Sequence, residues 1–173
     1  MCKVLYTEAM PPSYYPKLPV GSSAEKKGRI RKGYLTLAQL KLVVDGEKDL
    51  QRRTVFKLLY FCALRASEPG LQPVEHFAPE RRSLDIVRLK KSMGRTYVLE
   101  PWVLGDLLKW MKQRPPTCPF LFAHPKDSQL PLDRFNVFRW WREAVERVGL
   151  NVDNFGHPHV LKHSCGTHMF ERG

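Results

Sequence analysis

Features that would place the protein in a membrane or outside the cell are missing from the sequence. No run of about eighteen apolar residues occurs, so no transmembrane helix is expected. The N-terminal segment reaches Pro11 and Pro12 without an apolar core, so we expect no secretory signal. No C-x-x-C pair occurs among the four cysteines, Cys2, Cys62, Cys118 and Cys165. Neither a zinc ribbon nor a disulfide framework is therefore indicated, and we expect reduced thiols in a cytoplasmic protein.

Acidic residues are scarce relative to basic ones. The 173 residues include 17 Asp and Glu against 29 Lys and Arg, which gives a formal net charge of +12 and a pI near 9.8. An excess of this size favours a polyanionic partner, most often nucleic acid, with an anionic membrane surface as the competing partner. The hydrophobic content of 43% is normal for a globular domain. The length suits one domain with a substantial core.

Residues 1–33 differ in composition from the rest and are predicted to form a leader or linker. They contain four prolines and the sequence Gly21-Ser22-Ser23, with little hydrophobic periodicity. Their basic run either remains a solvated tail or binds phosphates as an arm. The basic residues concerned are Lys26, Lys27, Arg29, Arg31 and Lys32. We expect the folded unit, residues 34–173, to begin at Tyr34.

The rest of the chain predicts helices around one small sheet. Thr36 is a good N-cap for a first helix over residues 37–44, and Asp49 for a second helix that we expect to end near Glu68, before Pro69-Gly70. Alternating apolar and polar residues over 84–89 and 96–99 predict a β-hairpin. The fold class expected from this order is mainly α with a small antiparallel sheet (α+β).

Three further helices follow the predicted hairpin. Pro101 opens the first of them, and Pro115-Pro116 ends it. The next begins after Asp133 and ends at Gly149, and the last begins near His159. The aromatic residues Phe135, Phe138, Trp140 and Trp141 could stack on bases, but a stripe of this kind on a helix is more often core, and we expect core. We expect Phe120 and Phe122 in the core as well.

Arg65 and Glu68 form the first candidate cluster. On a helix, residues three apart share a face, so the simple interpretation is a surface ion pair that contributes little. The apolar stretch before Arg65 suggests instead that a buried helix end presents the arginine, with Glu68 supporting it. The planar fork of arginine matches phosphate oxygens, which makes a phosphate clamp the alternative.

Basic residues of the predicted hairpin form the second cluster. Lys90 and Lys91 lie in its turn, followed by Arg95. Turn lysines are usually only solvated. A hairpin tip can also enter a nucleic-acid groove and place an ammonium group beside a phosphate oxygen. The local sequence does not decide between these interpretations.

The third cluster comprises His159, Lys162 and His163. With helical spacing, His159 and His163 face the same way, and Lys162 lies one turn from His159. A metal site is disfavoured because the glutamate of an H-E-x-x-H motif is absent. A histidine pair that caps the helix is one alternative. The other is a cationic cradle for a phosphate at the helix N-terminus, where the helix dipole favours an anion.

The three clusters together resemble the tyrosine recombinases, also called phage integrases. Ala63-Leu64-Arg65-Ala66-Ser67-Glu68 is similar to their first arginine box, G-L-R-x-S-E. The residues from Ile86 to Gly94 resemble the β-hairpin that carries the catalytic lysine. Residues 157–166 (H-P-H-V-L-K-H-S-C-G) resemble the second box, H-x-L-R-H, in a wording closest to the small recombinases that invert fimbrial promoter segments.

The resemblance implies cleavage of DNA by a tyrosine that forms a 3′-phosphotyrosine, with arginines and a histidine holding the phosphorane. Arg65 would be the first clamp arginine, supported by Glu68. Lys90, or failing it Lys91, would protonate the leaving oxygen, and His159 would be the histidine of the second box.

The chain departs from the family pattern in three respects. Lys162 replaces the second clamp arginine and lacks its bidentate fork. No tyrosine follows Tyr97, so the family nucleophile is absent. The family's N-terminal DNA-clamping domain has no room here. We therefore expect a catalytic domain truncated before its C-terminal segment, which binds DNA but is inactive alone.

Two alternatives remain open at this point. One is a non-catalytic DNA-binding regulator with the same fold, which Lys162 favours. The other is a zinc-dependent hydrolase that uses His157, His159, His163 or His168, for which no general-base carboxylate is suitably placed. The expected partners are double-stranded DNA and a full-length recombinase, with no cofactor, metal or membrane. Without an exchanged C-terminal segment, we expect a monomer with an exposed hydrophobic acceptor groove.

Overall fold

The computed structural model describes residues 33–89 and 94–172. Several basic residues with predicted roles therefore lie outside the described residues. These residues are Lys26, Lys27, Arg29, Arg31, Lys32, Lys90 and Lys91.

Side-chain caps fix the starts of the first two helices. Helix α1 spans Leu37–Asp45, and its N-cap Thr36 forms a capping box: Gln39 N donates to Thr36 Oγ1 at 3.2 Å, and Thr36 N donates to Gln39 Oε1 at 3.0 Å. Helix α2 spans Leu50–Phe61, and Asp49 accepts from Arg52 N at 2.9 Å. Both predicted N-caps are confirmed.

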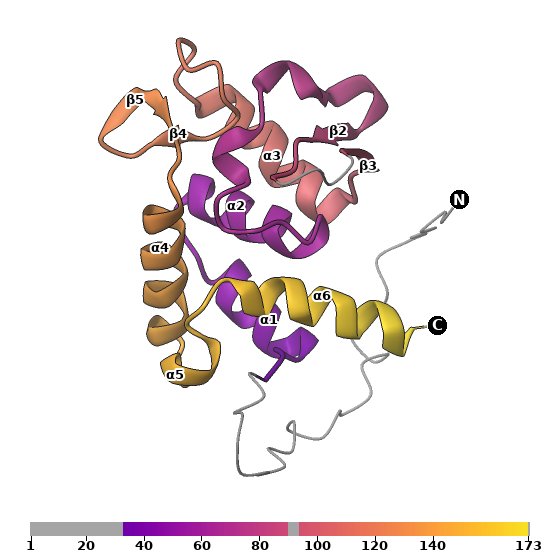
Figure 1. The fold of residues 1–173 in the computed structure, drawn as a ribbon, viewed down its shortest axis with the longest axis vertical. Helices are drawn as coiled ribbons and strands as arrows, with labels where there is room; N and C mark the ends of the chain where they lie inside the picture. The colour runs from indigo at the N-terminus through magenta and orange to yellow at the C-terminus, as the bar shows by residue number, and fades with distance from the viewer. Residues whose placement is uncertain (1–32, 90–93, 173) are drawn as a thin grey trace.

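Helix α2 is the central element of the fold (Figure 1). It packs against α1, α3 (Pro101–Gln113), α4 (Arg134–Arg147) and α6 (His159–Glu171). Val55, Phe56, Leu58 and Leu59 are fully buried in the core, and Trp141 of α4 meets Phe56 edge-on at 5.1 Å between ring centroids. Because elements from both ends of the described chain meet α2, it sets their relative positions.

The prediction that the second helix continues to near Glu68 is wrong. Helix α2 ends at Phe61, and Ala63 has a left-handed backbone with a φ of 49°. This turn lets Leu64 enter the core, where its N–H still bonds to the Leu59 carbonyl at 3.1 Å. Arg65 and Glu68 therefore lie in a loop, which we call the Arg65 loop (residues 62–68), and they do not share a helix face.

The predicted hairpin is confirmed as two strands of a three-stranded antiparallel sheet. Strands β1 (Phe77–Ala78), β2 (Ser83–Ile86) and β3 (Arg95–Val98) are neighbours in that order, with Ile86 opposite Arg95. Gly94 lies so close to the end of β2 that a Cβ atom there would be 2.7 Å from the Ile86 carbonyl oxygen. Strand β1 was not predicted. Two short 3-10 helices, η2 (Pro69–Leu71) and η3 (Val74–His76), precede it in the chain, and a third, η4 (Pro79–Arg81), follows it.

A second antiparallel pair, β4 (Ala123–His124) and β5 (Asp127–Pro131), precedes α4, and the short helix α5 (Val152–Phe155) follows it. The predicted starts at Pro101, Asp133 and His159 agree with the observed helices. Helix α5 was not predicted.

The core prediction for the aromatic stripe holds only in part. Trp140 and Trp141 are buried and Phe138 is partly buried, but Phe135 is 70% exposed. The buried face of α4 contains Val137, and a residue two positions away points to nearly the opposite side of a helix. Phe135 instead lies under the guanidinium of Arg134, 4.8 Å from its ring centroid. Phe122 is buried as predicted, whereas Phe120 is only partly buried.

A buried ion cluster holds α3 against α2. Lys57 Nζ and Arg53 Nε each lie 2.7 Å from Asp106 Oδ2. Burial alone would raise the pKa of Asp106, but the hydrogen bonds from Arg53 and Lys57 outweigh it and lower that pKa. The two cations therefore keep this carboxylate ionised in a poorly solvated place.

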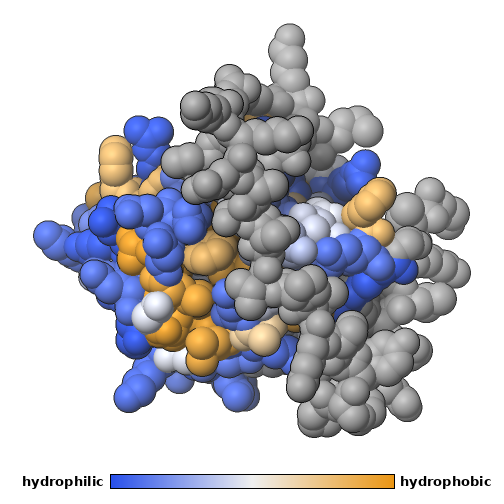
Figure 2. All heavy atoms as spheres, turned by 90° about the horizontal axis from the view of Figure 1, so that it is seen from below, coloured by the Kyte–Doolittle hydropathy of each residue, from blue (hydrophilic) through white to orange (hydrophobic). Residues whose placement is uncertain are grey.

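One face of the molecule carries an apolar area. Helices α1 and α5 lie at the lower end in Figure 1, and Figure 2 shows apolar side chains gathered in one area on that side, with hydrophilic residues around them. Leu37 of α1 and Val152 and Phe155 of α5 are partly buried and pack against the core. Within residues 33–89 and 94–172, no helix has the length and apolar character needed to cross a membrane.

Helix α6 is tied to the start of the described fold by one buried hydroxyl. Leu35 N donates to Ser164 Oγ at 2.9 Å, and the hydroxyl donates to the Val160 carbonyl at 2.8 Å. Ser164 and Leu35 are both fully buried. Removing the hydroxyl would leave the Leu35 N–H buried and unpaired.

We predict that Ser164→Ala lowers the free energy of unfolding by about 1–3 kcal/mol, because a buried donor loses its acceptor. Urea unfolding followed by circular dichroism measures the change. Ser128→Ala, at an exposed serine of β5, is the matched control and should change stability by less than about 0.5 kcal/mol. Equal effects of the two substitutions would contradict the prediction.

Candidate functional site

The Arg65 loop presents one arginine to solvent over a buried carboxylate. The Arg65 side chain is 45% exposed, whereas that of Glu68 is fully buried. Glu68 Oε2 accepts from the Arg65 backbone N–H at 2.8 Å, and the Arg65 guanidinium lies 3.4 Å from Glu68 Oε1 and 3.3 Å from the Leu89 carbonyl oxygen. The predicted pairing of Arg65 with Glu68 is present, although the loop geometry differs from the expected helix.

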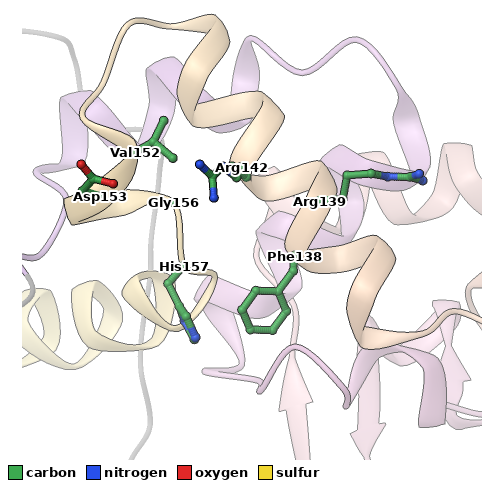
Figure 3. Close-up of a pocket in the computed structure, with 7 residues that line it drawn as sticks. All are labelled: Phe138, Arg139, Arg142, Val152, Asp153, Gly156 and His157. Carbon is green, nitrogen blue, oxygen red and sulfur yellow. The ribbon is translucent and has the colours of Figure 1, made fainter.

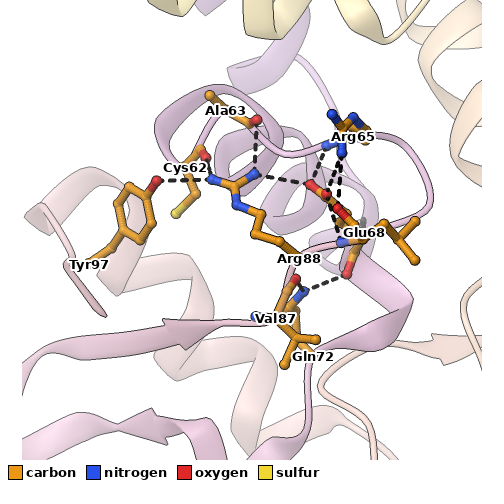
Figure 4. Close-up of polar contacts among 9 residues, drawn as sticks. Cys62, Ala63, Arg65, Glu68, Gln72, Val87, Arg88 and Tyr97 are labelled. Atoms are coloured by element: carbon orange, nitrogen blue, oxygen red, sulfur yellow. Dashed lines mark hydrogen bonds and ion pairs between the residues drawn. The ribbon is translucent and has the colours of Figure 1, made fainter. Parts of the chain in front are cut away.

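A second arginine, Arg88, lies on the other side of the same carboxylate (Figure 4). Its Nη1 is 3.0 Å from Glu68 Oε2, and it also donates to the Ala63 carbonyl at 3.1 Å. Its Nη2 donates to the Cys62 carbonyl at 2.6 Å and to the Tyr97 hydroxyl at 2.9 Å. The guanidinium therefore spans the space between the Arg65 loop and the β2–β3 hairpin.

The sequence analysis missed Arg88, although a signal for it was available. Side chains alternate between the two faces of a strand, and Leu84 and Ile86 of β2 are buried. Continuing that alternation places Arg88 on the buried face. A basic residue at an inward position needs an anionic partner, and Glu68 is that partner.

Gln72 joins the Arg65 loop to the segment that follows β2. Its amide nitrogen donates to the Glu68 carbonyl at 2.6 Å and to the Val87 carbonyl at 3.0 Å, and its amide oxygen accepts from Val87 N at 2.8 Å. Gln72 is fully buried, so all three bonds lie in a poorly solvated place and hold the two segments in register.

The start of α6 contributes a row of imidazole rings. His157 lies 6.2 Å from His159, and His159 lies 4.6 Å from His163, measured between ring centroids. His157 Nδ1 also accepts from the His159 backbone N–H at 3.1 Å, so this histidine caps the helix start. Figure 3 shows its ring facing that of Phe138 on α4, at 4.6 Å between centroids.

Helix α6, which carries the second predicted box, packs against α2, the helix that leads into the Arg65 loop. Burial lowers the pKa of His159, and the nearby charges of His163, His157, Lys162 and Arg65 lower it further. Arg65 belongs to the loop after α2, and Lys162 lies one turn along α6 from His159. The imidazole is therefore neutral at pH 7 and lies among cations, a setting that an anion would stabilise.

An open hollow extends the site along α4. It has a volume of about 500 Å³ and is lined by Phe138, Arg139, Arg142, Val152, Asp153, Gly156 and His157. In Figure 3, Arg142 lies near the hollow, while Arg139 extends away from the other labelled side chains. The hollow thus lies between α4 and the segment that leads into α6.

Two other predicted residues have different surroundings. Arg95 is exposed on β3. His168 lies on the far part of α6, where its Nδ1 is 2.9 Å from the Tyr60 hydroxyl. In the described ranges, no group of three or more His, Cys, Asp or Glu side chains is arranged to hold a metal ion. The hydrolase alternative therefore gains no support from this part of the chain.

A comparison with protein families gives a match that covers most of the chain. Residues 34–173 match the model described as the phage integrase family. A tyrosine recombinase of Thermosipho africanus is 33% identical over 134 residues, which cover 75% of this chain and 44% of that protein. Tyrosine recombinase XerA of Pyrococcus horikoshii is 29% identical over 140 residues, 80% of this chain and 48% of the relative. The chain thus spans about half the length of these curated relatives.

Solved structures show the same fold. A crystal structure of XerA recombinase has a TM-score of 0.69 at 16% identity and covers 81% of this chain and 51% of that chain. XerH site-specific recombinase, bound to its palindromic difH substrate in a post-cleavage complex, has a TM-score of 0.67 at 19% identity, with 82% and 43% covered.

The lowered pKa of His159 generates a pH prediction. The free imidazole should titrate below its usual value of 6.5, so the unfolded chain binds more protons there, and this residue makes stability fall as the pH drops below 6.5. A bound sulfate, whose charge is constant over this range, should raise the pKa. Sulfate affinity should then increase on acidification, by up to about tenfold for each unit that the pKa rises.

Proton NMR of the imidazole C2–H signals, with and without sulfate, measures both effects. His159→Gln should bind sulfate with a weaker pH dependence, because the group that takes up the proton is gone. A His159 pKa that sulfate leaves unchanged would show that no anion binds beside this ring.

Proposed function

The chain belongs to the phage integrase family, and from that premise we propose that it binds double-stranded DNA by holding a backbone phosphate among Arg65, His159 and Lys162. The observation that carries the proposal is the guanidinium of Arg65, which is half-exposed beside the fully buried Glu68 carboxylate. Its positive charge is one of those that lower the pKa of His159 on α6. The formal charge of +12 supports a polyanionic partner.

Each of the three side chains has a distinct task in this proposal. Arg65 offers a planar pair of N–H donors that fits two phosphate oxygens. His159, neutral when free, donates one N–H and can take up a proton as the phosphate approaches. Lys162 supplies a point charge without the fork of an arginine. Lys90, with Lys91 as the fallback, remains a predicted proton donor to a leaving oxygen.

The 173-residue chain has no tyrosine after Tyr97, and the Tyr97 hydroxyl accepts a hydrogen bond from Arg88. We therefore propose DNA binding without covalent capture by this polypeptide, as a domain of site-specific recombination. A full-length recombinase that supplies the tyrosine is the proposed protein partner. A monomeric state and a cytoplasmic location belong to the same proposal.

A non-catalytic DNA-binding regulator is the second candidate, and Lys162 favours it. A lysine keeps the attraction to phosphate but stabilises a pentavalent phosphorane less well than a bidentate arginine. The two candidates agree on DNA binding. They differ in whether strand cleavage appears when a tyrosine-bearing partner is added.

We predict that the protein binds a labelled DNA duplex with an affinity that falls steeply as salt is raised from about 50 to about 200 mM, because phosphate contacts release counterions. Arg65→Ala should weaken binding about tenfold, the loss expected for a charge-assisted contact. Fluorescence anisotropy measures both. Arg81→Ala, at an exposed arginine of η4 paired with Glu80, is the matched control, and absence of binding at low salt would overturn the proposal.

We also predict that Lys162→Arg tightens duplex binding several-fold, because a guanidinium can make two parallel bonds to one phosphate. The same anisotropy titration measures the gain. Lys112→Arg, at an exposed position near the end of α3, should leave the affinity unchanged. Equal gains from both substitutions would mean that Lys162 is not at the phosphate.

A further inference from the structure

We propose that Arg88 is a positioning residue that neutralises the buried Glu68 carboxylate and so leaves the guanidinium of Arg65 available to a phosphate. The inference rests on the proposed function and deepens it, because it concerns how the same site remains cationic. It assigns a role to a residue of the hairpin segment for which the family resemblance implied none.

The argument begins with the burial of Glu68. Its side chain is fully buried, and an ionised carboxylate in such a place is costly unless cations and hydrogen-bond donors surround it. Oε2 accepts from the Arg65 backbone N–H and from Arg88 Nη1, at 2.8 and 3.0 Å. Oε1 accepts from the Leu89 backbone N–H at 3.3 Å. The carboxylate thus depends on at least one cation.

Two arginines compete for that task, and their geometry separates them. Arg88 is 12% exposed and approaches Glu68 to 3.0 Å, whereas Arg65 is 45% exposed and approaches it to 3.4 Å. The Nη1 and Nη2 groups of Arg88 also donate to the Cys62 and Ala63 carbonyls and to the Tyr97 hydroxyl. Arg88 is therefore occupied by the protein, while Arg65 keeps an exposed face.

The charge balance follows directly. Two arginines and one glutamate leave a formal charge of +1 in the group, and the exposed member of the group is Arg65. Without Arg88, the only guanidinium within ion-pair distance of Glu68 would be Arg65 among the described residues. Arg65 would then be drawn onto the carboxylate, and the group would present no net charge to a phosphate.

Arg88 also holds the backbone that presents Arg65. Its Nη2 donates to the Cys62 carbonyl at the C-terminal end of α2, where the helix dipole favours a cation. Its Nη1 donates to the carbonyl of Ala63, the residue with the left-handed backbone. Burial works against the charged guanidinium, but Tyr97 and Glu68 outweigh it and raise the pKa of Arg88. An arginine guanidinium remains protonated near neutral pH, so Arg88 supplies a full positive charge beside Glu68.

A set of charge variants of the full chain tests the proposal, with duplex DNA and sulfate as separate probes. Arg88→Met removes the charge but keeps an unbranched side chain. It should weaken binding of both probes about tenfold, as much as Arg65→Ala does, although Arg65 is still present. The double variant Glu68→Gln/Arg88→Met removes both charges and should restore binding to within about threefold of the wild type.

A merely structural role for Arg88 gives the opposite pattern. The double variant would then bind no better than Arg88→Met, and the Arg65→Ala substitution would cost the same in the wild-type and Arg88→Met backgrounds. Either result would overturn the proposal. Thermal unfolding of each variant shows whether a loss of binding reflects loss of the folded protein.

Two conservative variants keep the test decisive if Arg88→Met does not fold. Arg88→Lys retains the neutralising charge and should bind both probes to within about threefold of the wild type. Glu68→Gln should bind as tightly as the wild type or more tightly, because the competing anion is gone. A loss of about tenfold in Glu68→Gln would show that Glu68 itself holds Arg65 for the phosphate, and the proposal would fail.

The probes separate this inference from the proposed function. Failure of the wild-type protein to bind duplex DNA at low salt overturns the proposed function. Normal duplex binding by the wild type, together with unimpaired binding by Arg88→Met, overturns only the role of Arg88. The Arg65 Nε–H signal in a nitrogen-15 NMR spectrum should move with sulfate in the wild type and in the double variant, but not in Arg88→Met.

Discussion

The carboxylate of Glu68 must be satisfied inside the protein, and the geometry of the candidate site follows from how this is achieved. Its oxygens accept from two backbone N–H groups, one in the Arg65 loop and one after β2, and from the guanidinium of Arg88. These bonds join the end of α2 to the hairpin. Because the anion is fixed in this way, Arg65 has a defined place at the surface above it.

The other half of the site is held by contacts of a different kind. Helix α6 lies against α2, and its buried side carries Ser164, which accepts from Leu35 N, and His168, which meets the Tyr60 hydroxyl. Burial lowers the pKa of His168, so this imidazole is a neutral hydrogen-bonding group in the core. These bonds fix one side of α6, and His159 and Lys162 lie in the first turn of the same helix.

Local signals in the sequence predicted most helix starts and the hairpin, because caps, prolines and alternation act over a few residues. The end of α2 could not be read in this way. The residues after Phe61 continue the apolar stretch. The turn at that point is accompanied by tertiary hydrogen bonds from Arg88 to the Cys62 and Ala63 carbonyls, which the local sequence does not reveal. Arg65, Glu68, His159 and Lys162 were recognisable by resemblance to short boxes. Arg88 lies between those boxes. The alternation of β2 predicts that it points inward, but its partner Glu68 is identified only by the three-dimensional structure.

The tie between Leu35 and Ser164 joins residues 129 positions apart, and the contact between Tyr60 and His168 spans 108 positions. The bonds of Arg88 to the Cys62 and Ala63 carbonyls span only 26 and 25 positions. Contacts between distant residues require large loops to close and form slowly, whereas nearby segments pair early. During synthesis from the N-terminus, the Arg65 half of the site can therefore order itself while α6 is still inside the ribosome. The candidate site is completed only when α6 docks, so a nascent chain carries an incomplete site until α6 has emerged from the ribosome.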